Sequence, residues 1–335
     1  MPKEILNWGL ISTARINRVL IPPLKASERN HLLAVASRDA EKAGTYAERW
    51  SIPESFGRYE EMLADPRIDV VYISLPNSLH APWAVAAADA GKHVLCEKPL
   101  ALTVEEVDSI IASGRRNGVH IAEAFMYRHH PQTLQVKDLV EEGAIGDLRM
   151  ARGSFSFFLS NPGDVRLDPE LGGGSIWDIG CYPISYIRTM FGGEPEEVFG
   201  QMDPTSQGVD LSFHGQMKFS GNRFGQFDCS FAGPLRSEIE IVGSMGSIYI
   251  PNPYKPSVNN RIEIRRDGAG EGSRIEVLPT ADQELYIGEV EDLASAILEG
   301  EEPLISLQDS RGNVAAIQAL LQSAKENRPV GVHVR

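Results

Sequence analysis

Three side chains in this sequence have the types and spacing for acid–base chemistry: Lys98, Asp178 and Tyr182. A phenol has an ordinary pKa of about 10, so Tyr182 needs a neighbouring cation to exchange protons near neutrality, and the Lys98 ammonium can supply that charge. Asp178 precedes Tyr182 by one helical turn, so both side chains can face the same side. Its carboxylate can orient substrate hydroxyls or the lysine. These residues predict a site that moves the proton of a hydroxyl group.

Lys98 follows an apolar run within a first third of the chain that alternates short apolar runs with helical stretches. This alternation is typical of βαβ units, and the parallel strands of such units carry ligands at their carboxyl ends. The sequence predicts a doubly wound parallel sheet, a Rossmann fold, over residues 1–126. The expected strands are Ile5–Gly9, Leu32–Ala36, Val70–Ser74, His93–Cys96 and Val119–Ala122, and the expected helices are Ala40–Trp50, Tyr59–Ala64, Pro82–Ala90 and Val104–Asn117.

Asp178 and Tyr182 lie in a second region, in which the pattern of residues is different. One expected helix, Pro131–Glu142, is followed by alternating runs of β-forming residues that turn signals such as Gly221-Asn222 separate. Two amphipathic helices, Gln283–Glu299 and Ser306–Glu326, close the pattern. Residues 127–335 are therefore predicted to form a substrate-binding and oligomerisation domain of the α+β class, with a large, mostly antiparallel open sheet.

The turn after the first predicted strand stands where a Rossmann fold carries its glycine-rich phosphate loop. Of the three glycines in G-x-G-x-x-G only Gly9 is present, with Ile11 and Ala14 at the other positions. A β-branched residue keeps the backbone from the closest approach to pyrophosphate, so an ordinary βα turn explains this segment equally well. The residues of this turn that could contact a bound dinucleotide are Gly9, Ile11, Ser12, Thr13, Ala14 and Arg15.

The end of the second predicted strand indicates which dinucleotide is bound. An acidic residue at this position ordinarily holds the ribose 2′-hydroxyl of NAD, but the sequence reads Ser37-Arg38-Asp39. A hydroxyl and a guanidinium suit the additional 2′-phosphate of NADP. In the alternative interpretation, Arg38 is a solvated helix-start residue and Asp39 makes the ribose contact. We predict NADP as the cofactor, with Ser37 and Arg38 as its 2′-phosphate contacts.

Composition and charge exclude several classes of protein. The formal net charge of −14 and the pI near 5.1 repel phosphate backbones and anionic membranes, so nucleic acid is not an expected partner. No stretch approaches the roughly 20 apolar residues of a membrane span, and the opening residues are too short and interrupted for a signal peptide. Three scattered cysteines fit neither a disulfide framework nor a metal knuckle, and His129-His130 lacks further ligands at metal spacing. A cytoplasmic protein without a metal is expected.

Three segments carry a specific likeness: Ser74–His80, Cys96–Leu100 with its Glu-Lys-Pro motif, and Leu171–Tyr182 with its glycine run and Asp-Ile-Gly. Together they resemble the family of glucose-fructose oxidoreductases, inositol dehydrogenases and MocA proteins over essentially the whole chain. Within it the sequence is most similar to NADP-dependent D-xylose 1-dehydrogenases and dimeric dihydrodiol dehydrogenases, which share Trp8-Gly9-x-x-Ser12 and the run Glu123–Arg128. Many inositol dehydrogenases carry histidine at the position of Tyr182, so inositol is a less expected substrate.

The resemblance implies an NADP-dependent oxidoreductase, with NAD as a further option, that oxidises the C1 hydroxyl of an aldopyranose such as D-xylose to the lactone. In this interpretation Tyr182 accepts the proton and Lys98 polarises the oxygen. A trans-dihydrodiol or cyclic polyol dehydrogenase and a keto-sugar reductase are alternatives that would use the same residues and cofactor. A non-catalytic NADP-binding sensor is the alternative from another class, but it would have no chemical need for Lys98, Asp178 and Tyr182. An NAD-dependent glycosidase would require a Cys/His metal constellation.

The resemblance also implies further site residues. It places Asn77 and His80 at the nicotinamide-side ribose, has Glu97 and Pro99 shape the Lys98 loop, and brings Arg166 toward the cofactor or substrate from the second domain. The cofactor contacts it adds are Leu75, Pro76, Asn77, His80, Glu97, Lys98 and Arg166, and the substrate contacts are Phe125, Met126, Arg128, Asp178 and Tyr182. A homodimer or homotetramer through the second domain's sheet is implied as well, with the aromatic strand Phe155–Phe158 in the core or at a subunit contact.

Overall fold

The computed structural model describes residues 4–257, 260–268 and 272–333, which divide into two compact units. The first unit holds the chain up to Met126 together with Tyr286–Arg311, and the second holds Tyr127–Leu285 and the chain from Gly312 onward. The predicted division assigned everything after residue 126 to the second domain. The structure differs because helix α8 (Ile287–Glu299) packs against helix α1 (Asn17–Ala26) of the first unit.

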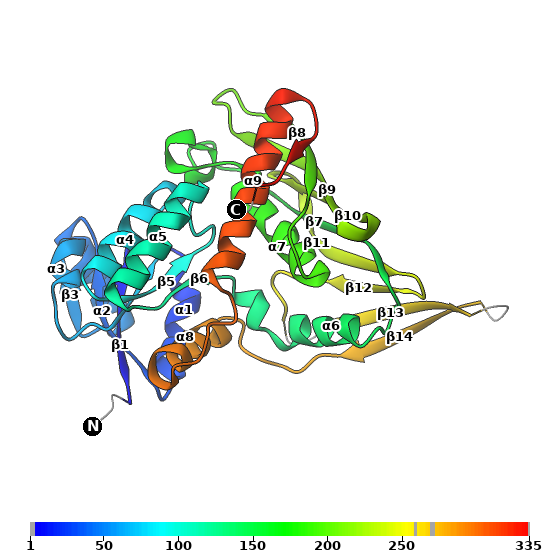
Figure 1. Cartoon of the computed structure of the whole chain (residues 1–335). Coiled ribbons are helices and arrows are strands. Elements are labelled where there is room, and N and C mark those ends of the chain that lie inside the picture. Colours follow the sequence, from blue (N-terminus) through cyan, green and yellow to red (C-terminus); the bar gives the residue numbers. More distant parts are fainter. Residues whose placement is uncertain (1–3, 258–259, 269–271, 334–335) are drawn as a thin grey trace. The chain divides into compact units, whose positions relative to one another are not determined.

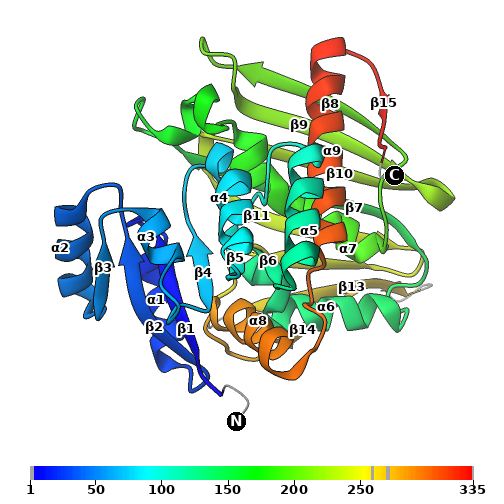
Figure 2. The ribbon, with the colours of Figure 1, turned by 60° about the vertical axis from the view of Figure 1, so that its left-hand side comes forward.

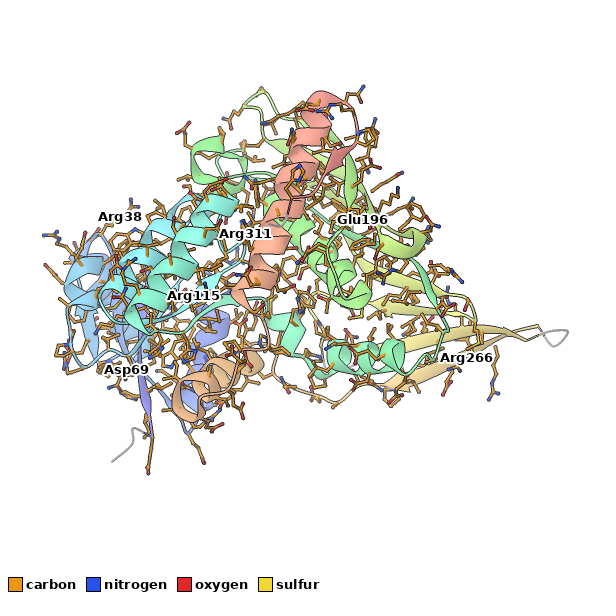
Figure 3. The ribbon with its side chains drawn as sticks, viewed as in Figure 1. Arg38, Asp69, Arg115, Glu196, Arg266 and Arg311 are labelled. Carbon is orange, nitrogen blue, oxygen red and sulfur yellow. The ribbon has the colours of Figure 1, made fainter. Side chains whose placement is uncertain are left out.

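Polar contacts fix this return of the chain to the first unit. Arg29, just before the second strand, donates from Nε to Glu291 Oε2 at 2.9 Å and from Nη1 to Glu299 Oε1 at 2.6 Å. At the start of helix α9 (Leu307–Glu326), Arg311, which is labelled in Figure 3, donates to both carboxylate oxygens of Asp108 at 2.7 and 3.1 Å. The residues 286–311 therefore belong to the first unit by packing and by charge.

The first unit contains a six-stranded sheet of order β3-β2-β1-β4-β5-β6, in which every ladder is parallel. This order confirms the predicted doubly wound sheet, with its switch point between β1 and β4. Helices α4 and α5 lie side by side (Figure 2). The strands are β1 (Leu6–Ile11), β2 (Asn30–Ala36), β3 (Glu54–Phe56), β4 (Val70–Ile73), β5 (His93–Glu97) and β6 (Ile121–Ala124), and the helices are α1 (Asn17–Ala26), α2 (Ala40–Trp50), α3 (Tyr59–Leu63), α4 (His80–Asp89), α5 (Val104–Asn117) and α8.

Local signals explain most of these elements. All four residues of β4 are buried, as expected for a parallel strand covered on both faces. Helix α5 begins at a capping box between Thr103 and Glu106 and ends at Gly118, whose φ of 64° suits glycine. Helix α1 contains Pro22 and Pro23, which ordinarily indicate a break, so the sequence did not indicate its bounds.

The second unit contains a nine-stranded sheet of order β14-β13-β12-β11-β7-β10-β9-β8-β15. Strands β7 and β10 run parallel and the other described neighbours antiparallel, which confirms the predicted mostly antiparallel sheet. The strands are β7 (Leu148–Phe158), β8 (Glu197–Pro204), β9 (Asp210–Phe219), β10 (Arg223–Ser230), β11 (Ala232–Gly243), β12 (Ser247–Pro251), β13 (Arg261–Gly268), β14 (Gly272–Pro279) and β15 (Val330–Gly331), and the helices are α6 (Pro131–Glu141), α7 (Cys181–Phe191) and α9 (Leu307–Glu326).

One face of this sheet is covered by helices α7 and α9 (Figure 1). A Cβ on Gly200 of β8 would stand 2.7 Å from the carbonyl oxygen of Leu320, so α9 lies directly on the strand. The other face is polar and holds a shallow depression of about 270 Å³. Its lining residues are Arg152, Phe199, Gln201, His214, Gly215, Gln216, Gln226, Phe227 and Asp228. In the part of the chain that is described, no helix is long and apolar enough to cross a membrane.

Candidate active site

The carboxyl ends of the strands in the first unit carry most of the predicted cofactor residues. Ile11 pairs with Ala36 and with Ile73, and Ile73 pairs with Cys96, so β1, β2, β4 and β5 end at the same edge of the sheet. The segments that follow these strands are residues 12–16, 37–39, 74–76 and 98–100. Open α/β sheets bind their ligands at this edge.

The first of these segments corrects the predicted motif. Strand β1 extends to Ile11, two residues beyond its predicted end, so Gly9 and Ile11 lie inside the strand and do not form the loop. A Cβ on Gly9 would stand 2.8 Å from Met62 Sδ, so glycine leaves room for that side chain, and the Ile11 side chain is fully buried. The turn begins at Ser12, which has a φ of 109°.

The conformation of Ser12 shifts the glycine motif by three residues. Positive φ is the conformation that the first glycine of such loops provides, and helix α1 begins five residues later at Asn17. Ser12, Ala14 and Asn17 therefore occupy the three glycine positions. Thr13 and Ala14 are half-buried in this loop and Arg15 is exposed.

The residues after β2 make different contacts, which bears on whether Arg38 or Asp39 contacts the ribose end of the cofactor. Asp39 caps helix α2, since its Oδ1 accepts from the backbone N–H groups of Glu41 and Lys42 at 3.0 and 3.1 Å. Ser37 is buried and its Oγ accepts from Asp39 N at 3.3 Å. Arg38 is exposed (Figure 3), and its guanidinium also makes a hydrogen bond with the Tyr59 side chain. Helix capping thus engages Asp39, whereas the Arg38 guanidinium is exposed beside the strand end.

The backbone around Lys98 is anchored from several sides. Tyr72 donates a hydrogen bond from its phenol to Glu97 Oε1, and Leu100 N donates to Glu123 Oε1 at 2.8 Å. The peptide between Lys98 and Pro99 is cis, and the Lys98 side chain is half-buried. Several fixed groups therefore set the position of the Lys98 backbone at the end of β5.

His80 lies between two of these segments. Its ring nitrogens stand 2.7 Å from Pro99 O and 2.8 Å from Leu75 O, and the residue is 1% exposed. Burial lowers the pKa of His80, and the Lys98 charge lowers it further, so the ring is neutral and donates to one of the two carbonyls. His80 therefore joins the two loops, and its place at the nicotinamide-side ribose stays a prediction. Pro76 and Asn77 remain half-buried at the same strand edge.

The second unit positions Asp178 and Tyr182 at the start of helix α7. The predicted α-helical turn is a π-helix, η5 (Ile176–Gly180), and such single turns are frequent at functional sites. Arg166 donates from Nε to Asp178 Oδ2 at 2.7 Å, and the nearby carboxylates of Asp178 and Asp164 raise its pKa. The structure thus joins two of the predicted site residues, Arg166 and Asp178, in an ion pair.

The glycine run before Asp178 packs against the turn that carries Arg166. A Cβ on Gly173 would stand 2.6 Å from the Arg166 carbonyl oxygen, and Gly174 has a φ of 120° and no room beside Asp210. Asp210 of β9 was not predicted from the sequence. Its Oδ2 accepts from Ser175 Oγ at 2.6 Å and from Ile176 N at 2.7 Å, and burial raises its pKa to about 6. A buried carboxyl group therefore anchors the start of the π-helix.

Tyr182 is 4% exposed within a cluster of aromatic rings. Its ring centroid lies 5.8 Å from that of Tyr127, 5.5 Å from Phe155 and 5.9 Å from Tyr254. Phe155 is therefore a core residue, as one of the two predicted options had it. The sequence analysis did not single out Tyr127 and Tyr254, although Tyr127 lies within the recognised run Glu123–Arg128.

The predicted substrate residues fall in both units. Phe125 and Met126 end the first unit and are buried, at 1% and 3% exposure. Arg128 belongs to the second unit and donates from Nη1 to Ser185 Oγ of α7 at 3.3 Å. His130 caps α6 by accepting from Gln132 N at 3.1 Å. Among the described residues, no group of three or more His, Cys, Asp or Glu side chains is arranged to hold a metal ion.

Two family models match this chain, one in each half. Residues 6–125 match the model described as an oxidoreductase family with an NAD-binding Rossmann fold, and residues 133–249 match the GFO/IDH/MocA C-terminal domain. The chain belongs to the GFO/IDH/MocA family of oxidoreductases. This membership confirms the resemblance that the sequence motifs indicated.

Curated relatives in the GFO/IDH/MocA family cover most of the chain. An uncharacterized oxidoreductase of Rhizobium meliloti is 38% identical and D-xylose 1-dehydrogenase (NADP(+)) 2 of Haloferax volcanii is 34% identical, each over 96% of this chain and 98% of the relative. Trans-1,2-dihydrobenzene-1,2-diol dehydrogenase of Danio rerio is 36% identical over 73% of this chain and 74% of its own length.

Solved structures of GFO/IDH/MocA oxidoreductases match the whole fold. Aldose-aldose oxidoreductase from Caulobacter crescentus, complexed with glycerol, has a TM-score of 0.88 at 27% identity, covering 98% of this chain and 99% of that chain. The 3-ketoreductase KijD10 from Actinomadura kijaniata, complexed with NADP, has a TM-score of 0.88 at 29% identity over 95% and 98%. Levoglucosan dehydrogenase with NADH and L-sorbose has a TM-score of 0.90 at 25% identity over 98% and 99%.

Proposed function

We propose that this chain is an NADP-dependent dehydrogenase that oxidises the C1 hydroxyl of an aldopyranose such as D-xylose to the lactone. The observation that carries the proposal is the anchored Lys98 at the carboxyl end of β5, in a chain that also holds Tyr182 and the Arg166–Asp178 pair. The Haloferax relative is named for D-xylose and NADP, and the Caulobacter structure is named for aldoses, which supports this substrate class.

The residues of the first unit fit a dinucleotide. Ser12 adopts the glycine-like conformation of a phosphate loop, and helix α1 follows with no side-chain cap on its first N–H groups. A helix start of this kind binds phosphate through its backbone donors. The exposed Arg38 would pair with a 2′-phosphate, which favours NADP over NAD. Among the similar structures one holds NADP and another NADH, so the preference of this chain depends on its own Arg38.

Each proposed catalytic group has a defined task. A bound nicotinamide would supply the acceptor for the hydride, which leaves the carbinol carbon with its electron pair. The Lys98 ammonium donates a hydrogen bond to the reacting oxygen, which stabilises negative charge as the C–O bond becomes a carbonyl. Tyr182 takes the hydroxyl proton, and Asp178, held by Arg166, accepts a hydrogen bond from a neighbouring substrate hydroxyl.

A second candidate function uses the same groups. The Danio relative is named as a dehydrogenase of trans-dihydrobenzenediol and the Actinomadura structure as a 3-ketoreductase, which favours a cyclic diol or polyol, or a keto-sugar reduced in the reverse direction. A non-catalytic NADP sensor would keep the residues of the first unit and make no use of Tyr182. Substrate screening in both directions separates these functions.

The decisive experiment follows absorbance of the reduced nicotinamide with NADP⁺ and NAD⁺ in parallel, against D-xylose, D-glucose, other aldoses, inositol and cyclic diols. Lys98→Met and Tyr182→Phe are expected to lose turnover, whereas the matched variants Lys137→Met and Tyr249→Phe, whose side chains lie on α6 and β12, keep it. NADP binding without turnover on any substrate in either direction would reject the dehydrogenase and favour the sensor.

We also propose that the chain assembles as a homodimer or homotetramer through the polar, uncovered face of the nine-stranded sheet. Large apolar side chains at one end of this sheet support the proposal, since Phe158 and Leu235 are 71% and 75% exposed. Gln216 and Gln226 pair directly on this face. Replacing both with arginine places like charges together and is expected to shift the sedimentation coefficient to that of a monomer. An unchanged oligomer would reject this face as the contact.

A further inference from the structure

The dinucleotide loop of this chain contains a conformational problem at Ser12. A φ of 109° is readily adopted by glycine, whereas a residue with a Cβ is strained there. The loop nevertheless has to hold this backbone if the following N–H groups are to face a phosphate. Some other interaction must therefore stabilise Ser12 in the conformation that glycine would adopt without cost.

The Ser12 side chain and backbone are both tied to strand neighbours. Its N–H donates to Ala36 O at 3.1 Å. Its Oγ lies 3.1 Å from Ser74 O and 2.8 Å from Ser74 Oγ, and it accepts from Ala14 N at 3.1 Å. The single hydroxyl hydrogen is directed to Ser74, so the Ser12 hydroxyl serves the loop itself rather than a phosphate, contrary to the expectation from its position.

Asn17 closes a ring with these two serines. Its Nδ2 donates to Ser12 O at 2.9 Å, and its Oδ1 accepts from Ser74 Oγ at 2.6 Å. Asn17 is fully buried and Ser74 is 6% exposed, so water does not compete for the bond between these two side chains, whereas the bond from Asn17 to the half-buried Ser12 is partly buried. We name these three residues the Ser12–Asn17–Ser74 clasp. It joins the end of β1, the start of α1 and the end of β4.

We infer that the Ser12–Asn17–Ser74 clasp replaces the missing glycine and holds the phosphate loop in its dinucleotide-binding conformation, which makes Ser74 and Asn17 positioning residues for the cofactor. The inference rests on the proposed function, because it takes a dinucleotide as the ligand. It differs from a structural role in one respect: the clasp is needed only while residue 12 carries a Cβ. With glycine at position 12, the same loop conformation no longer depends on Ser74.

This dependence can be measured by dinucleotide affinity without any substrate. Titration of NADPH and NADH, followed by nicotinamide fluorescence, gives Kd for the full chain. Ser74→Ala is expected to weaken both by about tenfold, or about 1.4 kcal/mol. The Kd of Ser12→Gly is expected to stay within about twofold of the parent value, since glycine adopts positive φ freely. Adding Ser74→Ala to Ser12→Gly is expected to raise Kd by less than about threefold. Ser109→Ala, an exposed serine on α5, is the matched control.

Two further readouts keep the test independent of folding. Ser12→Ala retains the Cβ and removes only the hydroxyl, so it is expected to bind more weakly than Ser12→Gly. Amide hydrogen exchange of residues 12–17 without dinucleotide is expected to speed up in Ser74→Ala and not in Ser109→Ala. Equal losses from Ser74→Ala with serine or glycine at position 12 would overturn the inference. If the parent chain binds neither dinucleotide, the proposed function fails instead.

Discussion

Replacing Asp210 with asparagine should change how the stability of this protein depends on pH. Asp210 is 2% exposed and uses Oδ2 to accept from Ser175 Oγ and Ile176 N, while burial raises its pKa to about 6. A carboxyl group in the unfolded chain has a pKa of about 3.9. The folded state therefore holds the proton of this group more tightly than the unfolded state does.

The sign and size of the effect follow from linkage. Below about pH 3.9 both states are protonated, and between about pH 4 and 6 only the unfolded state releases its proton, so stability falls as pH rises. A pKa difference of about 2 at about 1.36 kcal/mol per pKa unit corresponds to about 3 kcal/mol lost by pH 7. Asparagine keeps an acceptor oxygen and has no charge, so Asp210→Asn should avoid this loss.

The assay is denaturant unfolding of the parent and Asp210→Asn between pH 4 and pH 8, with the exposed Asp203→Asn as the matched control. The difference in unfolding free energy between Asp210→Asn and the parent should rise from near zero at the acid end toward about 3 kcal/mol at neutral pH. A difference that stays flat across this range would refute the reasoning, because it would mean that Asp210 does not titrate there.

Three other substitutions test separate parts of the structure. Arg38→Ala should lower kcat/KM with NADP⁺ by about tenfold to a hundredfold and leave NAD⁺ nearly unchanged, because only NADP carries the 2′-phosphate; equal losses with both would reject the contact. Gly173→Ala should lower the free energy of unfolding by about 2–3 kcal/mol, because its Cβ would stand 2.6 Å from Arg166 O. Gly44→Ala, which has open space around it in α2, should instead raise the free energy of unfolding by about 0.5–1 kcal/mol, and denaturant unfolding measures both changes. Burial lowers the pKa of His93 to about 4, whereas a histidine in the unfolded chain gains its proton below about pH 6.5. The free energy of unfolding should therefore fall as the pH drops below about 6.5. Denaturant unfolding of His93→Asn at a series of pH values should lack the part of this fall that His93 causes.

The sequence predicts features that depend on near neighbours along the chain. The parallel sheet follows from alternating apolar runs, and the sequence places Lys98 and Arg38 at the sheet edge because each lies within two residues of a strand end. The capped helix α5 is marked at both ends by Thr103 and Gly118. In each case the residues that determine the structure lie within a few positions of the element, which is the range over which sequence patterns are informative.

The features that the sequence did not predict depend on partners far along the chain. Ser12 holds a glycine conformation because of Ser74, which is 62 residues away, so no local pattern marks it. Asp210 reaches Ser175 over 35 positions, and the start of the π-helix beside Asp178 is anchored by that contact. The placement of α8 depends on the bond from Arg29 to Glu291, 262 positions apart. Burial and long-range hydrogen bonds decided these positions, and neither is visible in a linear reading.

The return of α8 to the first unit also determines when that unit can finish folding. During synthesis β1 to β6 leave the ribosome early, but helix α8, which packs on α1 and carries the acidic partners of Arg29, is supplied only after strands β7 to β14 have been translated. A domain that is continuous in sequence can fold as it emerges, whereas the first unit cannot complete its packing until α8 has been translated. A recombinant fragment ending at Met126 would therefore be an incomplete dinucleotide-binding domain, and separate expression of the two halves requires a rearranged gene that joins residues 286–311 directly to the first segment.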